Sequence, residues 1–213
     1  KNQLMISDKR FQPREVQSII EEAIIKGVIV EKNSEEDFTK YQLNYRGFDI
    51  VGENYKNQKY GLFCSENKAF TRFRNLDFFT KRAIESKKPI IAFVNYKTNK
   101  LSDGWLFYHN KEVSSCKQVN FIEIIDLIND IHSKGMILKK PSIDNFKFDG
   151  VRVIVDGEVE KNYIGIIGKY LNFVHMKNSL FIFEKIYPFK NNFLYRVISK
   201  IAEIFHYSKD IPE

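Results

Sequence analysis

The order of patterns in the first half of the chain constrains the fold more than any other feature of the sequence. Segments 41–51 and 60–70 are rich in aromatic and β-branched residues, which indicates two adjacent antiparallel strands joined by the polar residues 56–59. Segment 75–88 has the apolar spacing of a helix, and 90–94 is a nearly continuous apolar run, as expected for a strand covered on both faces. These elements predict the α/β class, with a central mixed β-sheet flanked by helices.

Further elements are expected on both sides of this unit. Segment 13–26 begins with proline, keeps its apolar residues on one helical face and is followed by glycine, so it predicts a helix. Segment 105–108 is expected to pair with the apolar strand after a turn at Asp103-Gly104. Segment 120–134 predicts a second amphipathic helix, closed by Gly135.

The pattern changes after residue 140. Segment 151–159 is apolar around Asp156-Gly157, a pair that favours a type I′ turn, and it predicts a β-hairpin. Segment 193–205 predicts a last amphipathic helix. This helix could complete the core or pair with a second copy of the chain in a homodimer.

The composition bounds the class of protein. The 213 residues are 43% hydrophobic and 15% aromatic, as in an ordered globular chain. Only Cys64 and Cys116 occur, so no disulfide framework is expected, and no apolar run reaches the roughly 20 residues of a membrane helix. A soluble cytoplasmic protein is therefore expected. The net charge of +7 favours a polyanionic partner such as nucleic acid.

One group of polar residues has the chemistry of a metal site. Glu66 and Lys68 are two residues apart in a predicted strand, so their side chains would share one face, and Asp49 could face them from the neighbouring strand. Two carboxylates suit Mg²⁺ or Mn²⁺, which would polarise a bound phosphate and lower the pKa of its water. The ammonium of Lys68 would stabilise charge on the phosphorus oxygens. The set fits phosphodiester hydrolysis.

These residues also resemble the PD-(D/E)xK nuclease superfamily of restriction endonucleases and Holliday junction resolvases. The resemblance rests on Gly47-Phe48-Asp49, on the segment from Gly61 to Lys68 and on the order of elements over about half the chain. It implies a restriction endonuclease-like core over residues 1–115 with a C-terminal α+β extension over 116–213. It also implies a magnesium-dependent endonuclease that acts on DNA and could be specific for junctions.

The resemblance further implies individual roles. Asp49 and Glu66 would bind the metal, the carbonyl of Asn67 would add a ligand, and Lys68 would activate the attacking water. A further acidic ligand on the first helix would be Glu22 or Glu15.

Four cations near these residues are candidates for binding a nucleic-acid backbone: Lys56, Lys59, Arg72 and Arg74. The aromatic residues beside them could stack on unpaired bases, or could instead belong to the core. His109 is the one histidine that the predicted strands bring near the carboxylates.

Two other functions stay open at this point. Lys147-Phe-Asp-Gly-Val-Arg152 resembles the nucleotidyltransferase motif of ATP-dependent ligases, whose lysine becomes adenylated, although Asp149-Gly150 and Asp156-Gly157 are more simply turns around one strand. The other is a non-catalytic nucleic-acid-binding protein, such as a viral or plasmid regulator that uses its basic face. Loss of metal-dependent cleavage on Asp49→Ala would distinguish the nuclease from such a regulator.

Overall fold

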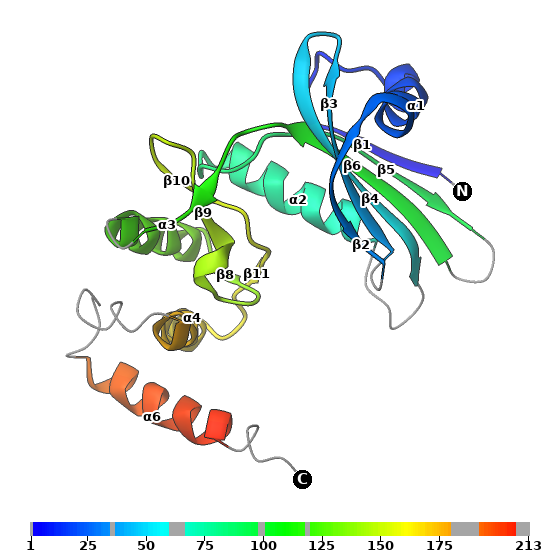
Figure 1. Cartoon of the computed structure of the whole chain (residues 1–213). Helices are drawn as coiled ribbons and strands as arrows, with labels where there is room; N and C mark the ends of the chain where they lie inside the picture. The colour runs from blue at the N-terminus through cyan, green and yellow to red at the C-terminus, as the bar shows by residue number, and fades with distance from the viewer. Residues whose placement is uncertain are drawn as a thin grey trace. The chain divides into compact units, whose positions relative to one another are not determined.

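A computed structural model describes residues 2–34, 37–59, 67–97, 101–117, 120–179 and 192–207 (Figure 1). The chain divides into two compact units, residues 1–111 and residues 112–213. We describe each unit by itself. None of the helices in these described segments is long and apolar enough to cross a membrane.

The N-terminal unit is built on a six-stranded sheet in which every neighbouring pair is antiparallel. The strand order is β1-β5-β6-β4-β3-β2. The strands are β1 (Asn2–Ile6), β2 (Val28–Asn33), β3 (Phe38–Tyr45), β4 (Phe48–Lys59), β5 (Pro89–Tyr96) and β6 (Leu101–His109). The α/β class is confirmed, whereas the predicted mixed sheet is antiparallel.

Two helices cover the two faces of this sheet. A 3₁₀ turn (Pro13–Glu15) leads into α1 (Val16–Lys26), whose buried residues join Trp105 and Phe107 in one hydrophobic cluster. Helix α2 (Lys68–Lys81) contacts β5, β6 and β4 on the other face. Because side chains alternate along a strand, the neighbours Leu106 and Tyr108 point toward the α2 face.

Several predicted boundaries in this unit are wrong. Segment 41–51 spans two strands, joined by a tight turn at Arg46 and Gly47, whose φ angles are 51° and 83°. Residues 56–59 continue β4 instead of connecting strands. Asp103 and Gly104 lie inside β6, which pairs with β5 as expected.

The helix predicted over 75–88 begins and ends earlier. Asn67 caps α2, because its side-chain oxygen accepts a hydrogen bond from the amide of Ala69 at 2.9 Å, and the helix ends at Lys81. The predicted strand over 60–70 therefore ends in helix. Its first seven residues lie outside the described part of the chain.

The C-terminal unit combines helices with short strands. The helices are α3 (Phe121–Ser133), α4 (Ile166–Ser179) and α6 (Phe193–Tyr207), with a 3₁₀ turn at Ile143–Asn145. The strands are β7 (Ser114–Ser115), β8 (Met136–Leu138), β9 (Phe146–Phe148), β10 (Val153–Val155) and β11 (Val159–Lys161). They form a sheet of order β10-β9-β7 and a separate pair β11-β8.

The pairing of these strands corrects the predicted hairpin. Val153–Val155 pairs back with β9, so the hairpin turn lies at residues 149–152. After Asp156-Gly157 the chain leaves that sheet, and β11 pairs with β8. The Asp156-Gly157 turn therefore carries the chain between two sheets instead of closing a hairpin. Helices α3 and α6 confirm the predictions over 120–134 and 193–205.

Candidate functional site

The three residues of the predicted nuclease site do not form a described cluster. Asp49 is exposed near the start of β4, where its carboxylate accepts a hydrogen bond from Asn110 at 2.8 Å. Lys68 is exposed in the first turn of α2. Glu66 lies outside the described residues.

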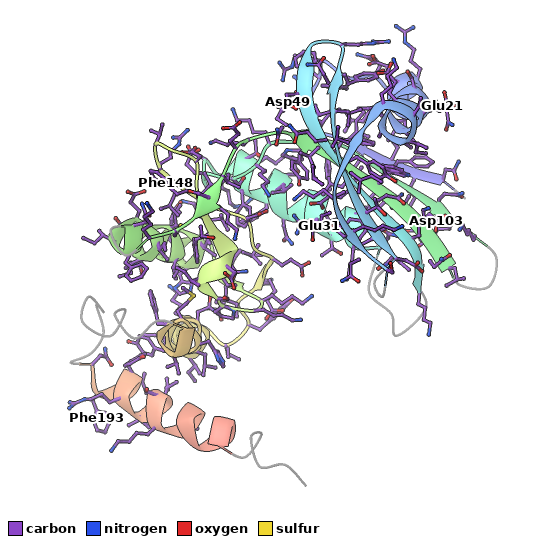
Figure 2. All side chains as sticks on the ribbon, viewed as in Figure 1. Glu21, Glu31, Asp49, Asp103, Phe148 and Phe193 are labelled. Carbon is purple, nitrogen blue, oxygen red and sulfur yellow. The ribbon has the colours of Figure 1, made fainter. Side chains whose placement is uncertain are left out.

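Strand register shows that Asp49 and Lys68 lie too far apart for Lys68 to act on water at a metal bound by Asp49. The residue after Asp49 pairs with His109 at one end of β6, whereas Asn67, next to Lys68, donates to Ser102 Oγ at 3.0 Å near the other end. Seven residues of strand separate those positions by roughly 20 Å. Figure 2 shows Asp49 and Asp103, the neighbour of Ser102, at opposite ends of the sheet.

Of the other predicted ligands and cations, Glu22, Glu15 and Arg72 form ion pairs within the unit. Glu22 pairs with Lys26 at 3.7 Å along α1, and Glu15 pairs with Arg46. Lys56, Lys59 and Arg74 are exposed, and Arg72 pairs with a buried glutamate. Within the described residues, no group of three or more His, Cys, Asp or Glu could hold a metal ion.

The ligase-like segment is a hairpin turn. Lys147 pairs across the sheet with Ile154, and the Asp149 carboxylate accepts hydrogen bonds from the amides of Val151 and Arg152 at 2.9 and 2.8 Å. These bonds are those of an Asx turn, so Asp149 has a local structural role.

A buried charge network lies on the α2 face of the N-terminal unit. Glu53, in the middle of β4, is 3% exposed. Its Oε2 lies 2.9 Å from Arg72 Nε on α2 and accepts a hydrogen bond from the Tyr55 hydroxyl at 2.6 Å. Its Oε1 accepts one from the Tyr108 hydroxyl at 2.9 Å. Burying a carboxylate is costly unless it is paired, and here one cation and two hydroxyls compensate it.

A second charged group lies at the start of the same unit. Asp8 accepts hydrogen bonds from Arg10, and the Nε2 atom of His109 lies 2.8 Å from Asp8 Oδ2. The Arg10 guanidinium also lies over the ring of Phe48, 4.6 Å from its centroid. Hydrogen bonds from Arg10, aided by His109, hold the pKa of Asp8 well below its usual range although partial burial opposes this. The histidine flagged in the sequence is therefore part of an ion-paired surface group.

The C-terminal unit joins Asn145 and Asp156 by a main-chain hydrogen bond. Asn145 ends the loop after β8, and Asp156 follows β10. The amide of Asp156 donates to the main-chain oxygen of Asn145 at 2.7 Å. A Cβ atom at Gly157 would lie 2.7 Å from Asn145 Nδ2, so glycine leaves room for this side chain. Carboxylate and amide oxygens are the donor types that Mg²⁺ takes in proteins.

An ion pair holds the start of this loop against the same turn. Lys139 Nζ lies 3.4 Å from Glu158 Oε2, and the Lys139 amide donates to the Glu158 carbonyl at 3.0 Å. The side-chain oxygen of Asn145 accepts a hydrogen bond from the Ser142 amide at 2.8 Å. A carboxamide oxygen has a second lone pair, so Asn145 keeps an acceptor position for a ligand.

A buried asparagine fixes the strand that leads into the loop. Asn172 on α4 accepts a hydrogen bond from the Leu138 amide at 2.7 Å and donates to the Leu138 carbonyl at 3.0 Å. Its Oδ1 also lies 3.2 Å from His132 Nε2. Burial lowers the pKa of His132 to about 4, so the ring is neutral near pH 7. The loop thus starts from a firmly anchored residue.

Sequence reasoning missed Glu53, Asn145 and Asn172 and treated Asp156 only as a turn residue. The local signal for Glu53 was weak, because β4 also carries Asp49, Asn54 and Lys56. Asn145 and Asp156 meet because they flank the paired strands β9 and β10, a register that the letters around either residue do not reveal.

No family model and no curated protein matches the chain. Among solved structures, WaaP in complex with acyl carrier protein aligns with a TM-score of 0.57 at 7% identity, covering 83% of this chain and 80% of that one. A mutant of the Neurospora crassa PAN3 pseudokinase aligns with a TM-score of 0.44 at 8% identity, over 80% of this chain and 55% of that one. The aminoglycoside phosphotransferase APH(4)-Ia, in a ternary complex with ADP and hygromycin B, aligns with a TM-score of 0.36 at 9% identity, over 93% and 61%.

The WaaP alignment spans both units and corrects the fold family. The restriction endonuclease-like expectation is wrong, and with it the predicted DNA endonuclease. Nothing supports the ligase or nucleic-acid-binding alternatives either. At 7% identity the similarity concerns the fold alone, and that fold is protein kinase-like.

Proposed function

We propose that this chain binds a nucleoside triphosphate as its magnesium complex, with Asn145 and Asp156 as the metal ligands. Protein kinases hold Mg²⁺ with the Asp of a D-F-G motif and with the Asn of the catalytic loop. Here Asp156-Gly157 follows β10, and Asn145 closes the loop between β8 and β9. The 2.7 Å hydrogen bond between their main chains is the observation that carries the proposal.

The donor types fit the ion. An Mg²⁺ ion takes one or two protein oxygens and completes its coordination with water and phosphate oxygens, so a full protein cage is not needed. The bound ion would neutralise the charge of the nucleotide phosphates. Asp156 is half-buried, and Lys139 is drawn toward Glu158 by their ion pair.

The position of the kinase base carries the wrong charge for proton transfer. In the kinase motif H-R-D-x-x-x-x-N the Asp stands five residues before the Asn and accepts the proton of the substrate hydroxyl. Five residues before Asn145 this chain has Lys140. The ammonium of a lysine has three N–H donors and no acceptor, so it cannot accept that proton.

The N-terminal unit reverses another kinase feature. Kinases pair a strand lysine, which contacts the phosphates, with a glutamate on the following helix. The strand-to-helix pair described here is Glu53 on β4 with Arg72 on α2. The connection between β2 and β3, where kinases have their glycine-rich loop, reads Ser-Glu-Glu-Asp over residues 34–37. Metal binding is therefore the kinase property that these residues favour most.

Nucleotide titrations test this proposal. In calorimetry, ATP with Mg²⁺ should bind the full chain, ATP with EDTA should bind far more weakly, and Asp156→Asn should weaken Mg-ATP binding by tenfold or more. Asp149→Asn is the matched control, because it alters the other Asp-Gly turn of the same unit. The proposal fails if Asp156→Asn and Asp149→Asn have the same affinity as the unchanged chain.

Phosphoryl transfer is the second candidate function, and Asp144 favours it. This exposed carboxylate immediately precedes Asn145 in the loop and lies 3.3 Å from Ser142 Oγ. It could act as the base in place of the missing aspartate. ATP turnover that is lost in Asp144→Asn, while Mg-ATP binding persists, would establish transfer. Absence of turnover by the unchanged chain would leave metal–nucleotide binding alone.

A further inference from the structure

A hollow of about 500 Å³ opens on the C-terminal unit beside the start of the loop. Residues 137–142 form one wall, Glu160 on β11 a second, and α4 the third, through Gly168, Leu171 and His175. Neither Asn145 nor Asp156 lines it. Its volume falls within the range of about 300–1,000 Å³ that is typical of small-molecule sites.

The floor of the hollow is preformed. Leu138 is 1% exposed, and both of its main-chain polar groups are bonded to the side chain of Asn172. Gly168 leaves room for the side chain of Asn162, which precedes α4, since a Cβ at Gly168 would lie 2.4 Å from Asn162 Oδ1. A site with such a fixed wall loses little conformational entropy when a ligand binds.

The two lysines at this hollow, Lys139 and Lys140, differ in their ion pairs. Lys139 pairs with Glu158 at 3.4 Å. Lys140 is exposed and makes no ion pair with any residue that the structure describes. Its ammonium is therefore the cation at this hollow that is available to an anionic group.

The remaining walls limit what else the ligand carries. Leu171 and Ile164 present apolar surface. Glu160 also lines the hollow, and its negative charge would repel a second anionic group. A polyanion such as a nucleotide is therefore a poor match for this hollow.

We propose that this hollow binds a small amphipathic anion, whose one carboxylate or phosphate group pairs with Lys140 and whose short apolar part lies against Leu171 and Ile164. The proposal is separate from metal–nucleotide binding at Asn145 and Asp156. Each of the two can fail without the other.

Calorimetry of the full chain with octanoate, octan-1-ol and octylamine tests the class of ligand. Octanoate should bind at least tenfold more tightly than the other two compounds, because only octanoate provides both the anion and the apolar chain. Equal affinity for octanoate and octan-1-ol would overturn the role of the lysine. Displacement of octanoate by Mg-ATP would overturn a separate site.

Variants locate the charge partner. Lys140→Met should weaken octanoate binding about tenfold, and the neighbouring Lys139→Met should change it less than twofold. Thermal unfolding of each variant controls for folding, and Leu171→Ala, which shortens the apolar wall, provides a second measurement. The proposal is overturned if the two lysine variants behave alike and Leu171→Ala has no effect.

A lipid headgroup could present the same chemistry. Flotation with vesicles of phosphatidylcholine containing phosphatidic acid distinguishes that source from a free molecule. Vesicle binding together with no affinity for octanoate would contradict a small-molecule site.

Discussion

The two units treat their charged residues in opposite ways. In the N-terminal unit, Glu53 and Arg72 neutralise each other under two tyrosine hydroxyls, and the carboxylate is almost fully buried. In the C-terminal unit, Asp156 is half-buried beside an asparagine that keeps an acceptor position. Glu53 is therefore compensated within its own unit, whereas Asp156 stays partly accessible to solvent.

Breaking the internal pair should give the largest effect. Arg72→Met leaves Glu53 buried without its cation, and we expect unfolding in urea to show a loss of about 3 kcal/mol. The double variant Glu53→Met/Arg72→Met should recover most of that loss, because no buried charge is left. A single-variant loss below about 1 kcal/mol would mean that the pair is not a buried charge pair in solution.

The two units should lose stability at different pH values as the solution is acidified. The folded-state pKa of His132 is lowered to about 4 from 6.5, so between these values the unfolded chain binds a proton that the folded chain does not. Stability therefore falls as pH falls, by about 2 kcal/mol between pH 6.5 and 5. His132→Gln should flatten the dependence in this range. An unchanged slope in that variant would assign the proton to another group.

The N-terminal unit should lose its acid-sensitive stability at lower pH. The folded-state pKa of Asp8 lies below its ordinary value of 3.8, so the stability it contributes is present above pH 3.8 and is lost as the pH falls through the lower folded value. Hydrogen exchange at pH 5 should therefore increase in the C-terminal unit first. Equal increases of hydrogen exchange in both units at pH 5 would contradict the expected difference in acid stability.

Two glycines sharpen the contrast between stability and ligand binding. Gly157→Ala places a methyl group against Asn145, and we expect roughly a tenfold weaker affinity for Mg-ATP in calorimetry. Gly150→Ala instead strains a backbone with φ of 91° and should cost about 1 kcal/mol of stability with unchanged affinity. If Gly157→Ala and Gly150→Ala changed affinity and stability to the same extent, this result would contradict the placement of the metal ligands.

The smallest effect is expected at Asp49. Its carboxylate is exposed and makes one side-chain hydrogen bond, with Asn110, so Asp49→Ala should cost no more than about 0.5 kcal/mol. Its affinity for Mg-ATP should equal that of the unchanged chain. A large loss of metal-dependent binding in this variant would show that the wrong unit was chosen.

Periodic patterns predicted the helices at 13–26, 120–134 and 193–205 because an amphipathic face is a local property of the sequence. Turn residues were less informative. Asp103-Gly104 lies within a strand and Asp156-Gly157 between two sheets, since the partner of each strand is decided by distant segments. The cap at Asn67 was likewise not predicted, because its side chain is held by a contact with Ser102, which lies 35 residues further along the chain.

The candidate site was harder to predict than the fold. Asp49, Glu66 and Lys68 were grouped because their residue types suit a metal, and strand register shows Asp49 and Lys68 at opposite ends of β6. The usable signal was a spacing: Asn145 shortly after a helix and a short apolar strand, then Asp156-Gly157 after the next two strands. That spacing is informative only when a kinase-like order of elements is already suspected.

The Asn172 side chain has a consequence for how the C-terminal unit folds. It supplies both hydrogen-bond partners of Leu138 from 34 residues further along the chain. Neither bond can form until α4 has docked against Leu138. The loop that carries Lys140 and Asn145 should therefore reach its final conformation late in folding, after α3 and α4 have come together.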